Sequence, residues 1–142
     1  MGIIFSIIAG ICMSLQGVFN TRLSEKIGDW ETSAIVQGSG LLLTLLILLF
    51  FGNGHFSNIK HVNKLYLSGG LLGVIIVFTV MKGMSSLGPG YAVGIILISQ
   101  LIVAALIDIF GIFGTSKINF HYTQVIGIIL MIIGVIVFKY KK

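Results

Sequence analysis

This sequence has few charged side chains. Asp, Glu, Lys and Arg make up 9% of its 142 residues, against roughly a quarter in an ordinary soluble domain. The hydrophobic fraction is 56% and the mean hydropathy is +1.11, which indicates an integral membrane protein. A backbone in lipid must satisfy its own hydrogen bonds, so it spans as helices or as a closed barrel. Long unbroken apolar runs lack the alternation of barrel strands, and we predict an all-α bundle of transmembrane helices.

The sequence also lacks the residues on which catalytic and redox sites depend. Cys12 is the one cysteine, so no internal disulfide can form, and we expect it to pack as a small hydrophobe. Neither a nucleophile elbow nor a phosphate-binding loop is present, and the histidines have no metal-ligand spacing (His55, His61 and His121). We therefore expect no enzyme activity, no cofactor and no metal.

The net charge of +5 does not indicate a nucleic-acid partner. The basic residues flank apolar runs, and three of them close the chain, at Lys139, Lys141 and Lys142. This placement is typical of side chains that anchor a helix at phospholipid headgroups. The lipid bilayer is the partner that the charge pattern predicts.

Five apolar runs are separated by polar residues, each close to the ~20 residues needed to cross ~30 Å of hydrocarbon. They cover residues 2–19, 33–51, 65–81, 91–113 and 122–138. The third and fifth are the shortest, and flanking lysines that reach the interface extend them. None of the connections is long enough for a soluble domain, so we predict a single five-helix transmembrane domain over 1–142. The only proline, Pro89, is expected to open the fourth helix rather than kink it.

An odd number of spans puts the two termini on opposite faces of the membrane. We call the face of Met1 side A and the other face side B. Side A then carries three basic residues (Lys60, Lys64 and Lys117), and side B carries six (Arg22, Lys26, Lys82, Lys139, Lys141 and Lys142). The positive-inside rule favours side B in the cytoplasm, but three of the six side B residues lie in the terminal tail, and without them the count is three against three. The count therefore leaves both a dual and a weakly fixed orientation open.

A few polar side chains interrupt the apolar runs. Gln16 and Asn20 share one face of the first helix, because they are four residues apart. The fourth run holds Ser99, Gln100 and Asp108, the last being the only acid within an apolar run. A carboxylate or carboxamide in lipid is costly, so these residues should face protein or water.

Two interpretations stay open for these residues. In one, Gln16, Asn20, Ser99 and Gln100 bind a substrate and Asp108 is a proton or counter-charge site. In the other, the carboxamides make interhelical hydrogen bonds, Asn20 caps the helix end and Asp108 lies at the headgroups. The remaining acids, Glu25, Asp29 and Glu31, are expected in a connecting loop with little direct role.

Depth along the helices separates the polar residues of one copy. The first helix carries Gln16 and Asn20 toward side B, whereas the fourth carries Asp108 toward side A. In an antiparallel dimer, Asp108 of one copy would share a leaflet with Gln16 and Asn20 of the other. Two Gln100 side chains would then share the midplane, and a continuous polar path could form.

Glycine is abundant, with 19 residues, and several are spaced for close helix contact in lipid. Small residues four apart let two backbones approach, and a pair seven apart marks one face of the last helix. This set is expected to pack within the bundle or at a dimer seam (Gly69, Gly70, Gly73, Gly90, Gly94, Gly127 and Gly134).

Nearly the whole chain resembles the YdcZ family, also called DUF606, of the drug/metabolite transporter superfamily. The resemblance rests on four stretches, "GICMSLQGVFNTRL", "SGGLLGVIIVF", "LGPGYAVGIILISQLIVAALIDIFGIFG" and "GIILMIIGVIVF". Its joint residue pattern comprises Gln16, Asn20, Gly69, Gly70, Gly73, Gly88, Gln100, Asp108 and Gly111.

The resemblance implies five-helix units that work as antiparallel pairs, as dual-topology homodimers or as heterodimers of oppositely inserted relatives. Related small multidrug exporters use a first-helix glutamate for proton exchange, and this chain has Gln16 instead. We accordingly expect a transporter of the bacterial inner (plasma) membrane that exports a small polar or amphipathic metabolite or drug by alternating access. A small dual-topology ion channel and a non-transporting accessory subunit are the rival hypotheses.

Overall fold

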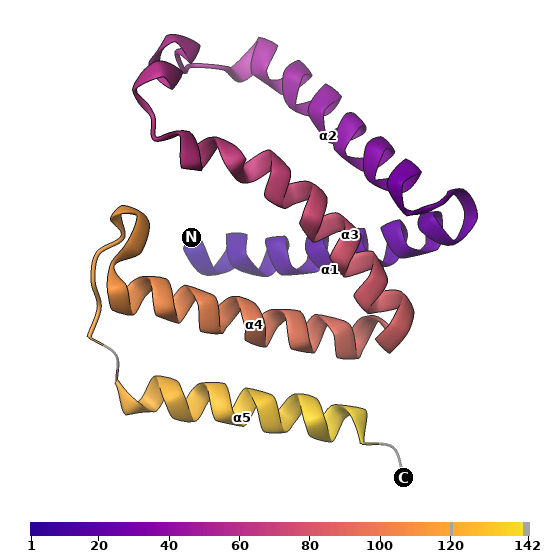
Figure 1. Cartoon of the computed structure of the whole chain (residues 1–142), viewed down its shortest axis with the longest axis vertical. Helices are drawn as coiled ribbons and strands as arrows, with labels where there is room; N and C mark the ends of the chain where they lie inside the picture. The colour runs from indigo at the N-terminus through magenta and orange to yellow at the C-terminus, as the bar shows by residue number, and fades with distance from the viewer. Residues whose placement is uncertain (120, 141–142) are drawn as a thin grey trace. The chain divides into compact units, whose positions relative to one another are not determined.

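Helices make up the fold of this protein, as the computed structural model of the chain shows (Figure 1). The structure describes residues 1–119 and 121–140. Within these residues, the α-helices are α1 (Gly2–Ile27), α2 (Asp29–Phe51), α3 (Gly69–Leu87), α4 (Pro89–Phe110) and α5 (Tyr122–Lys139). Short 3₁₀ helices are η1 (Phe56–His61), η2 (Lys64–Ser68) and η3 (Ile112–Gly114). In this part of the chain, 5 helical segments are long and apolar enough to span a membrane, the third counted from Lys64 to Leu87.

The first helix extends eight residues beyond the expected end at residue 19. The added segment is polar but favours helix, and it includes an ion pair between Arg22 and Glu25, three residues apart. At 1.5 Å per residue, 26 residues reach about 39 Å. The last turns of α1 therefore lie beyond the hydrocarbon on side B. Residues there need not be apolar, so hydropathy does not mark the end of the helix.

Single glycines separate two pairs of helices on side B. Gly28, with φ 102° and ψ 158°, lies between α1 and α2, and Gly88, with φ 81° and ψ 153°, lies between α3 and α4. Side chains rarely adopt a positive φ with such a ψ, so glycine is the residue that permits both breaks. Pro89 is the first residue of α4, which confirms that it opens this helix.

The side A connections are longer than those on side B. Between α2 and α3 the chain forms η1 and η2, and the Asn63 side chain accepts a hydrogen bond from the Leu65 N–H at 3.0 Å. After α4 the chain turns at Gly111, in the left-handed conformation with φ 61°. The helix α5 begins with a capping box in which Gln124 accepts from the His121 N–H.

The chain divides into two compact units, Met1–Ser85 and Ser86–Lys142. In the first, α1 and α2 form a hairpin at Gly28, and α3 returns to the side B end of that hairpin (Figure 1). In the second, α4 and α5 lie side by side and run in opposite directions. Most apolar side chains of the spans are exposed on the surface of the chain. Cys12, which was expected to pack as a small hydrophobe, is exposed as well. The hydrocarbon of the membrane covers such surfaces.

Candidate functional site

Gln16 and Gln100 each lie near the middle of a membrane helix. Gln16 comes eleven residues before Ile27, the end of α1, and Gln100 comes eleven residues after Pro89, the start of α4. Each is thus about 16 Å along its own helix from the side B end of that helix. Both side chains are exposed, and neither makes a hydrogen bond with another residue that the structure describes. The extension of α1 puts Gln16 near the middle of the helix, but the added turns lie beyond the hydrocarbon, so Gln16 remains in the side B half of the span.

Asn20 is not at a helix end. It lies seven residues before the last residue of α1, so the capping role that the sequence left open does not apply. The side chain is buried, with 7% of its surface exposed. Asn20 is therefore part of the packed interior of the first unit, whereas Gln16, one turn earlier, is on its surface.

A small polar core fills the place where α1, α2 and α3 converge on the side B half. Its members are the buried residues of the first unit: Gly17, Asn20 and Thr21 of α1, Thr32 and Ser33 of α2, and Met81 and Met84 of α3. Gly17 permits this convergence, because a Cβ there would overlap the end of the Met84 side chain. Apolar contact in this core is thus provided by two methionines, which adapt well to irregular space.

Thr32 is the most unusual member of the polar core. Its side chain is completely buried, and its hydroxyl has no hydrogen-bond partner among the described residues. Three other helical threonines, Thr21, Thr44 and Thr79, each donate to the carbonyl four residues earlier at 2.8 Å. The burial of Thr32 could not be predicted from the sequence, since a hydroxyl near a helix start gives no signal of burial.

Asp108 lies two residues before the end of α4, close to side A as expected. Its side chain is half-buried and forms no ion pair with any described residue. Its backbone carbonyl accepts a hydrogen bond from the Ile118 N–H at 3.0 Å, so the following loop folds back onto this last turn. Ser99, by contrast, donates to the Ile95 carbonyl of its own helix at 2.9 Å, which satisfies its hydroxyl.

The expectation that Glu25, Asp29 and Glu31 lie in a loop is corrected, because all three are helical. Glu25 is in α1, and Asp29 and Glu31 form the acidic first turn of α2, where the helix dipole favours them. Asp29 also forms an ion pair with Lys82 of α3, at 2.5 Å. This pair joins the side B ends of α2 and α3.

An aromatic pair supports the same junction. The Trp30 and Phe78 rings are stacked, with centroids 4.8 Å apart and planes 13° from parallel. The Lys82 ammonium lies 5.8 Å from the centroid of the Phe78 ring, within the range of a cation–π contact. The second unit has a related contact at side B, where Lys139 lies 4.4 Å from the centroid of the Tyr91 ring.

Several of the expected packing glycines contact a neighbouring helix. A Cβ on Gly90 would come within 3.1 Å of Phe138, and one on Gly94 within 2.8 Å of Val135, so both permit the approach of α4 to α5. Gly73 lies against Gln37 of α2, whose amide nitrogen would be 3.0 Å from an added Cβ. Gln37 is a further carboxamide inside an apolar run, and it meets the same criterion as Gln16.

The remaining glycines of that set have open surroundings. A Cβ on any of them would meet no atom within 4 Å among those described (Gly69, Gly70, Gly127 and Gly134). Close packing at these four positions stays a prediction. It would need a contact with lipid or with another protein surface.

Comparison with known proteins gives one family. A family model described as "Putative inner membrane exporter, YdcZ" matches residues 1–137. Neither the comparison with curated proteins nor that with solved structures gave a match.

Proposed function

Because the chain belongs to the YdcZ family of inner-membrane exporters, we propose that this multi-pass membrane transporter exports a small polar or amphipathic metabolite or drug by alternating access. The working unit in this proposal is an antiparallel dimer, formed by two copies or by one copy and an oppositely inserted relative. Gln16 and Gln100 bind the substrate, with Asn20 and Ser99 beside them, and Asp108 is the proton or counter-charge site.

The observation that carries the proposal is the exposure of Gln16 and Gln100 at mid-helix. A carboxamide that faces hydrocarbon without a hydrogen-bond partner costs several kcal/mol. Each of the two side chains therefore needs water or protein against it. A polar lumen supplies both, and a lumen that reaches the midplane is where an alternating-access transporter holds its substrate.

An antiparallel dimer accounts for the depth of both carboxamides. A two-fold axis in the membrane plane leaves residues at the midplane at the same depth in both copies. With about 30 Å of hydrocarbon, Gln100, about 16 Å from the side B end of α4, is close to that plane. Gln16 lies nearer side B, because the last turns of α1 are outside the hydrocarbon. Two Gln100 side chains, one from each copy, would then lie in one layer with one Gln16 toward each face, and the four carboxamides would offer both donors and acceptors to a substrate.

Asp108 has a different place in the proposed cycle. It lies near the side A end of α4, so in an antiparallel dimer each leaflet contains one such carboxylate. A carboxylate without an ion pair near a membrane boundary can take up a proton or attract a cationic group. It would act as a gate or counter-charge on the path, one to each side, rather than in the central layer.

Flux in liposomes tests the site assignment. With candidate metabolites and cations screened first, Gln100→Ala and Asp108→Asn should each lower the flux of a transported compound at least tenfold. Thr44→Val is the matched control, since this exposed hydroxyl already bonds to its own helix. Wild-type flux in both site variants would contradict the assignment. Turnover above ~10³ per second, or resolvable unitary currents, would instead favour a channel.

Accessibility of single cysteines tests the antiparallel pairing. In a Cys12→Ala background, Ser57→Cys reports side A and Tyr140→Cys reports side B. With dual orientation, each cysteine is labelled from both faces of the cell membrane by an impermeant reagent. Labelling of each from one face only would leave a fixed orientation, and the homodimer would be contradicted in favour of an oppositely oriented partner or a monomer.

A further inference from the structure

The connection between α2 and α3 is unusually apolar for a loop. Apolar side chains recur through η1 and η2, and they are exposed: Phe56 is 74% exposed and Ile59 is 49% exposed. A loop in water would leave this apolar surface uncovered. The loop follows α2, whose 23 residues reach about 34 Å and so end at the side A boundary of the hydrocarbon. Membrane lipid is therefore the medium that this segment meets.

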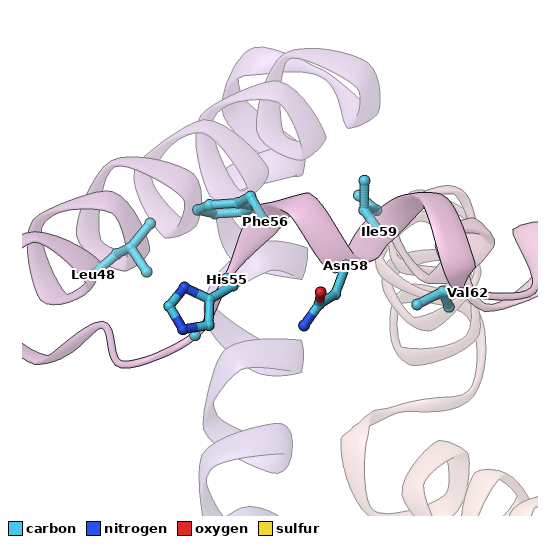
Figure 2. A pocket seen from close by; sticks show the side chains of 7 residues that line it. Leu48, His55, Phe56, Asn58, Ile59 and Val62 are labelled. Carbon is cyan, nitrogen blue, oxygen red and sulfur yellow. The ribbon is translucent and has the colours of Figure 1, made fainter.

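The same segment encloses a groove of about 310 Å³ with the last turn of α2. Its lining includes Leu48 of α2 and, from the loop, His55, Phe56, Asn58, Ile59 and Val62. Phe56 and Ile59 are three residues apart in η1 and share one side of it, as expected for three residues per turn. Figure 2 shows the His55 and Asn58 side chains together on the opposite side. Val62 lies on the side of His55 and Asn58, so the groove is lined by apolar groups and by hydrogen-bonding groups of the same segment.

The charge of the segment has one sign. Residues 52–68 contain Lys60, Lys64 and two histidines, and no acid occurs between Glu31 and Asp108. Neither lysine forms an ion pair with any residue in the described ranges, and both are exposed. Two unneutralised ammonium groups at a membrane boundary attract anionic headgroups. Each lysine near the surface raises the affinity for an anionic lipid about fivefold.

We propose that residues 52–68 and the end of α2 form a binding site for one anionic phospholipid. An acyl chain occupies the apolar groove beside Leu48, Phe56 and Ile59. The phosphate lies at the membrane surface, where Lys60 and Lys64 neutralise it and the polar side chains of the segment donate hydrogen bonds. A lipid fits better than a soluble anion, because a soluble anion would leave the apolar groove uncovered. The inference depends on the membrane location and not on transport.

Quenching of tryptophan fluorescence by brominated lipid tests the proposal. The chain has one tryptophan, Trp30, so Trp30→Phe with Phe56→Trp gives a reporter at the groove alone. The full chain is reconstituted in vesicles with rising fractions of brominated phosphatidylglycerol or brominated phosphatidylcholine. We expect phosphatidylglycerol to be preferred at least fivefold. Symmetric vesicles make the result independent of orientation.

Three variants separate the parts of the site. Lys60→Gln with Lys64→Gln should abolish the headgroup preference, whereas Lys117→Gln, the other side A lysine, should leave it unchanged. Val62→Ser should lower quenching by both lipids. Equal quenching by the two lipids, no quenching by either, or an equal loss of preference in Lys117→Gln would each overturn the proposal. Helical content and monodisperse elution confirm that each variant is folded.

Discussion

Gly88→Ala tests whether one residue sets the turn between α3 and α4. Gly88 has φ 81° and ψ 153°, and it lies between the last residue of α3 and Pro89. An L-residue held in such a conformation costs about 1 to 3 kcal/mol. An added Cβ would meet no atom within 4 Å among those described. The cost therefore comes from the backbone and not from a clash.

Gly83→Ala is the matched control. Gly83 is inside α3, and a Cβ there would also meet no described atom within 4 Å. Because alanine favours helix over glycine by about 0.8 to 1 kcal/mol, this variant should be neutral or more stable. The two alanine variants should thus differ by about 2 to 4 kcal/mol in the free energy of unfolding.

The assay is the thermal midpoint of the purified protein in detergent, followed by the loss of the monodisperse elution peak. We expect a midpoint below wild type for Gly88→Ala and at or above wild type for Gly83→Ala. The thermal midpoint of Gly28→Ala should fall at least as far as that of Gly88→Ala. Gly28 also has a positive φ, and a Cβ there would in addition overlap the Glu31 carboxylate. A Gly88→Ala midpoint equal to that of Gly83→Ala would refute the argument that a positive φ sets this turn.

Further variants address contacts between helices. Asp29→Asn and Lys82→Gln should each lower the thermal midpoint, and a double-mutant cycle should give about 0.5 to 1 kcal/mol of coupling, because the lysine is more than half exposed. No coupling would mean that the pair adds nothing to stability. Thr32→Val should raise the midpoint by removing a buried hydroxyl without a partner, whereas Thr79→Val, which loses a bond to its own helix, should not. A lower midpoint for Thr32→Val would reveal a hydrogen bond to water or substrate. Gly94→Leu should separate α4 from α5 and abolish the folded elution peak, and a wild-type profile would contradict close packing there.

The number and nature of the spans could be predicted from the sequence, because hydropathy reports the segments that lipid must cover. The helix ends could not. Residues 20–27 continue α1 although they include Arg22, Glu25 and Lys26, since a helix does not stop where the hydrocarbon stops. A hydropathy criterion therefore assigned them to a loop.

The candidate site was predictable in part, for a related reason. Gln16, Gln100 and Asp108 stand out because they are polar within apolar runs. Gln37 stands out equally and was overlooked. The burial of Thr32 and the ion pair of Asp29 with Lys82 could not be predicted from the sequence. Both depend on which helices pack together at side B, and tertiary contacts determine that packing.

Within each unit, the close helix contacts lie toward side B. In the first unit these are the polar core, the ion pair of Asp29 with Lys82 and the ring stack of Trp30. In the second they are the contacts of Gly90 and Gly94 at the start of α4 with the end of α5. Toward side A the connections are longer, and Gly69, Gly70 and Gly127 have no described atom within 4 Å of an added Cβ. An antiparallel pair of such chains would give each leaflet one tightly packed end and one open end, and so treat the two sides of the membrane alike. In the proposed antiparallel dimer, that equivalence would make the inward-open and outward-open states structurally alike.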